Sequence, residues 1–205
     1  MNPLNYKIAL EPNLDQFNFR GKVEILMDVP KPVGEISLDA VELTIYKCMV
    51  TAEVVSVDCP FHVDSRKKVL KVSLPGEMAG KIRLRIDYEG SINDRMAGFY
   101  RSRFVANGRE KYIAVTQFQE SDARRAFPCF DQPAEKATFD IEMIVDQSLT
   151  AISNGPIAEE RRLSNGKKLV KFHRTPKMST YLLFFGVGPF EFIEDKKDVI
   201  VRVAT

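Results

Sequence analysis

The 205-residue chain carries 30 Lys and Arg against 28 Asp and Glu, for a formal net charge of +2, and the two signs are interspersed along it. Proteins that bind nucleic acid usually gather Lys and Arg into a basic patch. The near-neutral and interspersed charge of this chain does not have that pattern, so we expect no nucleic-acid partner. No apolar run approaches the roughly 18 residues that a membrane span needs, and the start of the chain does not read as a secretory signal, so we expect no membrane partner. The length suits one large domain with a substantial core, and we expect residues 1–205 to form it.

The three cysteines, Cys48, Cys59 and Cys129, are odd in number and lack the paired spacing of metal ligands. They are interpreted as reduced thiols, each serving as a small buried hydrophobe. Reduced cysteines and the absence of a signal predict a cytoplasmic location.

Alternating apolar and polar residues predict β-strands through the first half of the chain. After a break at Pro30 and Pro32 the alternation resumes. Val50–Val57 and Val69–Leu74 flank the polar residues 64–68 in the manner of a hairpin. The other strands expected here are Tyr6–Leu10, Val23–Val29, Ile36–Ala40, Leu43–Ile45 and Ile82–Tyr88, the last with one face in the core and one in water.

The second half continues this pattern. Ala137–Val145 alternates again, and the nearly continuous apolar run from Tyr181 to Val187 predicts a fully buried strand. A last strand is expected from Val199 to Val203. Ten or more short strands separated by turn signals predict an all-β sandwich or barrel-like domain.

One polar segment, Thr116–Phe139, interrupts the pattern with a high density of carboxamides, arginines, acids and prolines. Ser121 is a candidate N-cap, and one or two helical turns are expected near 121–127, ending before Pro128. Gln117 and Gln119 fall at the end of the preceding strand, where residues two apart share a face. Their carbonyl oxygens can accept hydrogen bonds from a cationic amine, although hydrogen bonding along the strand edge is the role that the residues alone favour.

A search for catalytic groups finds little else. The two histidines, His62 and His173, lack the spacing of a zinc helix, and phosphate-binding glycine loops and a nucleophile elbow are absent from the sequence. The acids Asp122, Asp131 and Glu135 could supply a pair of carboxylates for acid–base hydrolysis. Because the bases Arg124, Arg125 and Lys136 lie among them, structural ion pairs are the favoured interpretation.

Several segments resemble the N-terminal domain of the zinc aminopeptidases related to aminopeptidase N and puromycin-sensitive aminopeptidase. The resemblance covers essentially the whole chain. It is carried by Thr116–Gln119, Asp122–Pro133 and Lys136–Phe139, together with Tyr6–Leu10, Phe19–Gly21, Gly98–Ser102, Ser153–Gly155 and Thr175–Leu182, which occur in the order found in the family.

The resemblance implies a saddle-shaped, mostly antiparallel β domain that precedes a separate catalytic domain. That catalytic domain holds the zinc and the H-E-x-x-H helix, so this chain alone is expected to have no catalytic residue and no metal site, and to be inactive. The implied parent is a zinc metalloprotease, a hydrolase that removes N-terminal amino acids from peptides.

The resemblance also implies a role for Gln117 and Gln119, which correspond to positions that help to hold the free α-amino group of the peptide substrate. Some relatives carry Glu at the position of Gln119, and Glu is usual at that of Gln132. A neutral Gln119 leaves less negative charge to meet the substrate ammonium.

Two other functions stay open from the sequence. One is a non-catalytic interaction module that keeps the aminopeptidase architecture without its metal motif. The other is a free-standing β-sandwich that binds carbohydrate or protein. The residues that follow this chain in its gene would separate them, since H-E-x-x-H and G-x-M-E-N mark the catalytic domain.

Overall fold

A computed structural model of the chain describes residues 1–52, 55–194 and 200–203. Its largest element is a sheet of nine strands, in which β5 (Phe61–Asp64) pairs with β6 outside the main order. The main order is β11 (Ile157–Arg162), β12 (Lys167–Phe172), β9 (Thr138–Asp146), β1 (Asn2–Asn13), β2 (Asn18–Asp39), β6 (Val69–Ser91), β3 (Leu43–Ala52) and β4 (Val55–Asp58).

A second sheet of four strands follows the order β10 (Thr150–Ser153), β13 (Phe185–Gly188), β8 (Arg109–Gln117) and β7 (Gly98–Ala106). Two further strands, β14 (Glu191–Glu194) and β15 (Ile200–Val203), form a separate hairpin. The described helices are two single 3₁₀ turns, η1 (Ala123–Arg125) and η2 (Thr180–Leu182). No helix in the described ranges is long and apolar enough to cross a membrane.

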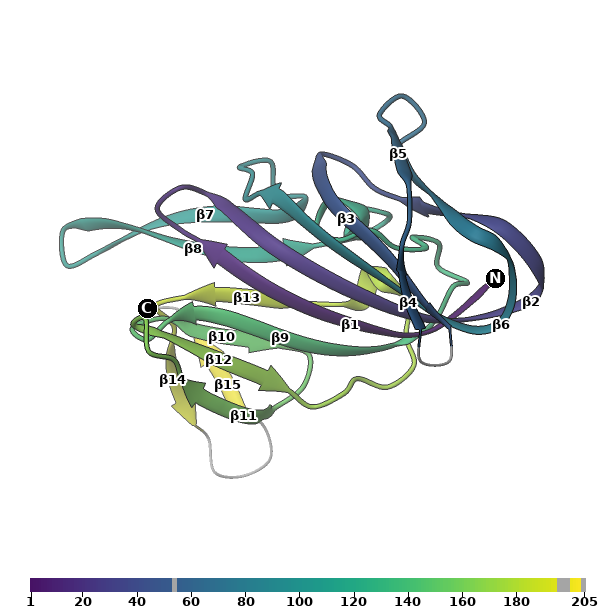
Figure 1. Cartoon of the computed structure of the whole chain (residues 1–205). Helices are drawn as coiled ribbons and strands as arrows, with labels where there is room; N and C mark the ends of the chain where they lie inside the picture. Colours follow the sequence, from purple (N-terminus) through teal and green to yellow (C-terminus); the bar gives the residue numbers. More distant parts are fainter. Residues whose placement is uncertain (53–54, 195–199, 204–205) are drawn as a thin grey trace.

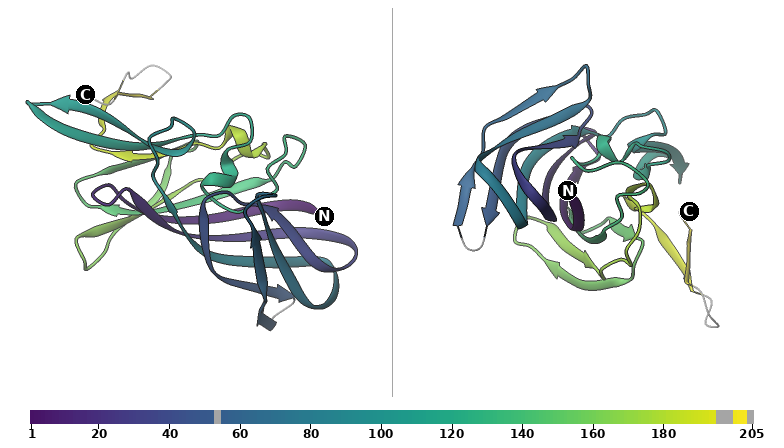
Figure 2. Two further views of the ribbon diagram at one scale, coloured as in Figure 1. Left: turned by 90° about the horizontal axis from the view of Figure 1, so that it is seen from above. Right: turned by 90° about the vertical axis from the view of Figure 1, so that its right-hand side faces the viewer.

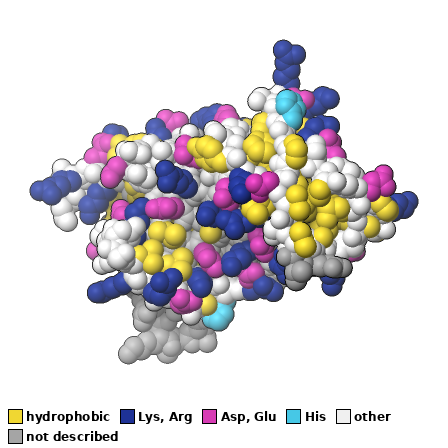
Figure 3. All heavy atoms as spheres, in the orientation of Figure 1, with side chains coloured by type: hydrophobic (Ala, Val, Ile, Leu, Met, Phe, Trp, Pro, Cys, Tyr) yellow, Lys and Arg dark blue, Asp and Glu magenta, His cyan; other side chains and the backbone are white. Residues whose placement is uncertain are grey.

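The two sheets form two layers around one core. The large sheet twists and bends along its long strands into a saddle, and the small sheet lies against one side of it (Figures 1 and 2). Among the described strands, β1 and β9 pair in parallel and the other pairs are antiparallel. The predicted all-β, mostly antiparallel architecture is therefore confirmed. Charged side chains of both signs are mixed across the face shown in Figure 3, as their distribution in the sequence predicts.

Alternating burial explains why these segments form strands. In β6, Ile82, Leu84, Ile86 and Tyr88 are at most 2% exposed, whereas the intervening Arg83 and Arg85 are exposed. The strand thus places one face in the core and the other in water, as predicted.

The predicted strand break at Pro30 and Pro32 is wrong. β2 runs on to Asp39, and the prolines cause only shifts in its register with β6 between Val29 and Glu35. β1 pairs with β2 no further than Asp28, so the prolines lie where one edge of β2 has no β1 partner. A missing N–H donor is tolerated at such an edge.

The predicted hairpin turn at 64–68 is correct, but its first strand is not Val50–Val57. The turn joins β5 to β6, and the Asp64 carboxylate accepts the N–H groups of Arg66 and Lys67. The earlier residues instead contribute to β3 and β4, which pair with each other.

The apolar run Tyr181–Val187 is only partly a strand. Thr180–Leu182 forms η2, Leu182 is 50% exposed, and β13 begins at Phe185. The Ser179 hydroxyl donates to the Pro133 carbonyl at 2.6 Å, and the Asn154 amide donates to the Leu182 carbonyl at 3.0 Å. These side chains hold the segment in a turn that the apolar composition did not indicate. Of the last predicted strand, Ile200–Val203 forms β15, and Val199 lies outside the described residues.

All three cysteines are free and buried, in agreement with the prediction. Burial raises the pKa of the Cys48 thiol to about 12. Such a thiol is protonated near neutral pH and packs as an apolar group.

Candidate functional site

The polar segment begins where β8 ends, at Gln117. β7 fixes this strand end from one side, because Gly98 lies opposite Gln117 in the antiparallel register. On the other side, the Thr116 hydroxyl oxygen accepts the Phe185 N–H at 3.1 Å. The position of Gln117 is therefore set by hydrogen bonding across the four-stranded sheet.

Phe118 anchors the chain immediately after the strand. It is 1% exposed, and its ring packs edge-on against Phe127 and Phe185, with centroid distances of 6.1 and 5.8 Å. Because Phe118 points into the core, its neighbours Gln117 and Gln119 point out of it, and both are exposed. The alternation that predicted a shared face thus persists one step past the end of the strand.

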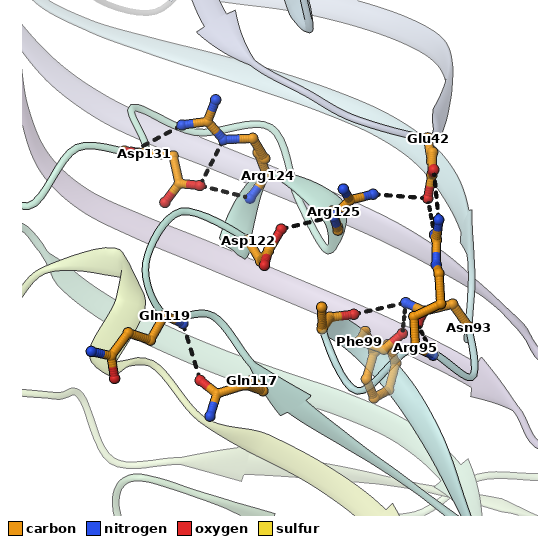
Figure 4. Close-up of polar contacts among 11 residues, drawn as sticks. Glu42, Asn93, Arg95, Phe99, Gln117, Gln119, Asp122, Arg124, Arg125 and Asp131 are labelled. Carbon is orange, nitrogen blue, oxygen red and sulfur yellow. Dashed lines mark hydrogen bonds and ion pairs between the residues drawn. The ribbon is translucent and has the colours of Figure 1, made fainter.

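Gln117 and Gln119 lie at the end of β8, with the Gln117 carboxamide turned toward the backbone of Gln119 and the Gln119 carboxamide directed away from it (Figure 4). The Gln117 Oε1 atom accepts the backbone N–H of Gln119 at 3.0 Å. Within the described part of the chain, the carboxamide of Gln119 itself makes no hydrogen bond, and the Gln119–Glu120 peptide bond is cis. Gln119 therefore presents an unused carbonyl acceptor and an unused amide donor to the surface.

A single helical turn follows, as predicted, but its cap differs. The N-cap of η1 is Asp122 rather than Ser121, and its carboxylate makes no capping hydrogen bond. The Asp122 carboxylate instead accepts from Arg125 Nε at 2.8 Å, while the Asp122 N–H donates to the Phe118 carbonyl at 3.0 Å. An ion pair thus replaces the expected Ser121 cap.

Arg124 and Asp131 fix the far end of the segment. Asp131 is 2% exposed, and its Oδ2 accepts both Arg124 Nε at 2.9 Å and the Arg124 N–H at 3.2 Å. Its Oδ1 accepts the Thr180 hydroxyl at 2.7 Å, and Arg124 also pairs with Asp39 at 3.0 Å. Burial opposes the charged form of Arg124, but these carboxylates outweigh it and raise the pKa of the guanidinium.

Two of the three acids, Asp122 and Asp131, form ion pairs within the segment, as the interleaved bases indicated, whereas Glu135 has no side-chain ion pair among the described residues. Asp122 and Asp131 each accept hydrogen bonds from an arginine of η1, so neither is free to act as a general base. Sequence reasoning missed the partners of the segment that lie outside it. Asp39 pairs with Arg124, Glu42 with Arg125 and Thr180 with Asp131, and nothing in the local sequence around these three residues marks that role.

The histidines lie apart from this segment. His62 is exposed on β5, and His173 is exposed just after β12. Among the described residues, no group of three or more His, Cys, Asp or Glu is arranged to hold a metal ion.

Fold and site together define a class. The structure is a β domain of two main sheets, and the loop after β8 exposes two carboxamides. The model of the Peptidase M1 N-terminal domain matches residues 2–182, and the chain belongs to that family.

Its relatives carry aminopeptidase names. The chain is 38% identical to a puromycin-sensitive aminopeptidase of Caenorhabditis elegans, with 99% of the chain and 22% of the relative covered. It is 37% identical to aminopeptidase 2 of Candida albicans (99% and 22% covered) and 38% identical to aminopeptidase M1 of Arabidopsis thaliana (98% and 23% covered). The chain thus spans about a fifth of the length of these relatives.

Proposed function

We propose that this chain is the N-terminal domain, over residues 1–205, of a zinc aminopeptidase that removes N-terminal residues from peptides in the cytoplasm. Within that enzyme the domain caps the catalytic domain and contributes Gln117 and Gln119 to the site that binds the substrate α-amino group. The observation that carries the proposal is the exposed pair of carboxamides at the end of β8, in a chain that matches this family along most of its length.

The chemistry of the two side chains suits the role. A substrate amine is an –NH₃⁺ group that donates hydrogen bonds, and a carboxamide oxygen accepts them without itself titrating. Gln117 Oε1 has one acceptor position occupied by the Gln119 N–H and a second lone pair to offer, and Gln119 Oε1 is not engaged by the described residues. An internal peptide segment has no ammonium group and would leave these oxygens unpaired, which favours chain ends.

The proposal assigns the zinc and the general base to the catalytic domain outside these 205 residues. A zinc ion there would activate the attacking water and polarise the scissile carbonyl. The present chain supplies no group to that chemistry; its residues bind and orient the amine. By itself the chain should then take up no stoichiometric zinc and hydrolyse no aminoacyl arylamide.

The alternative, a non-catalytic interaction module with the same architecture, requires a parent without the zinc motif. The aminopeptidase names of the relatives favour the enzyme, as does a loop that keeps both carboxamides exposed.

The decisive variant is Gln119→Ala in the full-length protein. Each charge-assisted hydrogen bond contributes roughly 1.5–3 kcal/mol, so kcat/KM for an aminoacyl arylamide should fall about tenfold or more. Gln132→Ala is the matched control, because Gln132 is an exposed carboxamide of the same segment outside the loop end. Steady-state kinetics that give the same kcat/KM for Gln119→Ala and the unmodified enzyme would remove this loop from the substrate site.

A further inference from the structure

The turn that carries Gln119 has few anchors of its own. Gln119, Glu120 and Ser121 are all exposed, and the hydrogen bond from the Gln119 N–H to Gln117 is the one that these three residues make among the described residues. The turn is therefore placed by its two ends. One end is the buried ring of Phe118, and the other is Asp122.

Arg125 holds the Asp122 end. Its Nε donates to Asp122 Oδ1 at 2.8 Å, and its Nη1 lies 3.0 Å from Glu42 Oε2. The Arg125 side chain is only 23% exposed, so both ion pairs are partly shielded from water. The planar guanidinium thus ties the end of the Gln119 turn to the connection between β2 and β3 (Figure 4).

Glu42 is itself held by a second arginine. Arg95, from the connection between β6 and β7, donates from both Nη atoms to the two carboxylate oxygens of Glu42. The hydrogen bonds from Arg95 and the nearby charge of Arg125 hold the pKa of Glu42 below its ordinary value, against the opposing effect of burial. Glu42 is therefore ionised at neutral pH and bridges the two arginines.

The aliphatic stem of Arg125 also contacts the strand beside Gln117. A Cβ built on Gly98 would lie 2.7 Å from the Arg125 Cβ, and Gly98 has a φ of +70°. Glycine suits this position because of both the close approach and the backbone conformation. Since Gly98 lies opposite Gln117 in the β7–β8 register, Arg125 lies close to the strand that pairs with Gln117 and is ion-paired to Asp122, three residues beyond Gln119.

We propose that Arg125 is a positioning residue for the substrate-amine site, acting through Asp122 and Glu42 to hold the Gln119 turn in register with Gln117. This role rests on the proposed function, since it matters only if Gln119 meets the substrate. Arg125 itself touches no substrate. Its guanidinium already forms ion pairs with Asp122 and Glu42.

A double-mutant cycle in the full-length enzyme tests this role. Arg125→Met keeps the stem and removes both ion pairs, and we expect about a tenfold fall in kcat/KM for an aminoacyl arylamide, mainly through a higher KM, because a misplacement of about 1 Å is costly at a binding site. In a Gln119→Ala background the same substitution should change kcat/KM by less than about twofold, because the group that Arg125 positions is gone.

Two further variants keep the test clear. Arg103→Met removes an exposed arginine that pairs with Glu110 on the β7–β8 hairpin, and it should leave the kinetics unchanged. Arg125→Lys retains a charge that can reach one carboxylate but not both. It replaces Arg125→Met in the double-mutant cycle if the methionine variant fails to fold. Its expected loss is smaller than that of Arg125→Met and likewise absent without Gln119.

The outcomes separate the two proposals. An equal loss in both backgrounds, or no loss in the unmodified background, would overturn the positioning role while leaving Gln119 in the site. If Gln119→Ala alone has no effect, the proposed function fails and the positioning role fails with it.

Discussion

Asp131 is the single residue that joins the most parts of the functional segment. Its carboxylate binds Arg124 of η1 and Thr180 of η2, and its N–H donates to Asp39 at the end of β2, at 3.0 Å. The side chain is fully buried, so every acceptor position that it offers must be satisfied by protein. The carboxylate of Asp131 thus connects the two 3₁₀ turns, and its N–H connects them to the large sheet.

Replacing this carboxylate should destabilise the fold. Asp131→Ala leaves Arg124 half-paired and the Thr180 hydroxyl without its acceptor, and we expect a loss of about 3 kcal/mol in the free energy of unfolding. Chemical denaturation followed by circular dichroism measures it. Glu110→Gln is the control, because the Glu110–Arg103 pair is exposed to water and should contribute little to stability. Equal stabilities for the two variants would show that Asp131 is not structurally important.

At the scale of elements, the close approach of β2 to β6 makes a second prediction. A Cβ on Gly21 would lie 2.3 Å from Cζ of the buried Tyr88 ring, whereas a Cβ on Gly34 of the same strand meets no atom within 4 Å. Gly21→Ala should therefore lower the unfolding free energy by about 1–3 kcal/mol through overpacking. Gly34→Ala should be neutral or slightly stabilising, since alanine restricts the unfolded chain. Thermal unfolding that gives both variants the same midpoint would contradict this packing.

The elements also show what a sequence can predict. Strands such as Ile82–Tyr88 can be predicted because buried and exposed residues alternate along them with a period of two. The turn at Thr180–Leu182 was missed because polar side-chain contacts override an apolar run. The Ser179 and Thr180 hydroxyls donate to Pro133 and Asp131, and the Asn154 amide donates to the Leu182 carbonyl. The strand break predicted at Pro30 and Pro32 is wrong because the effect of a proline on a strand depends on where the neighbouring strand, β1, stops pairing. That position is a property of the folded sheet.

The residues of the candidate site were likewise predicted only in part. Gln117 and Gln119 are visible in the sequence because they are adjacent on one short strand end. Glu42 and Arg95 are invisible there, because they lie 53 residues apart and are brought together only by the folding of β2, β3 and β6 around them. Local patterns therefore revealed the carboxamides of the proposed site and concealed the ion pairs around them.

At the scale of the whole molecule, the chain forms a two-layer β domain whose functional loop faces outward. Two ion-pair clusters, one centred on Asp131 and one on Glu42, fix this loop from below, while its carboxamides remain exposed. Such an arrangement binds little alone, because a ligand held by two carboxamides on an open surface is not desolvated. It becomes a binding site when a second domain closes over it, which is the role proposed here.

The most direct test is a crystal structure of the full-length protein with a bound peptide analogue that carries a free α-amino group. We predict that the amine nitrogen lies about 3 Å from Oε1 of Gln117 or Gln119, or of both. An amine held only by groups outside residues 1–205, with both carboxamides facing solvent, would contradict the account.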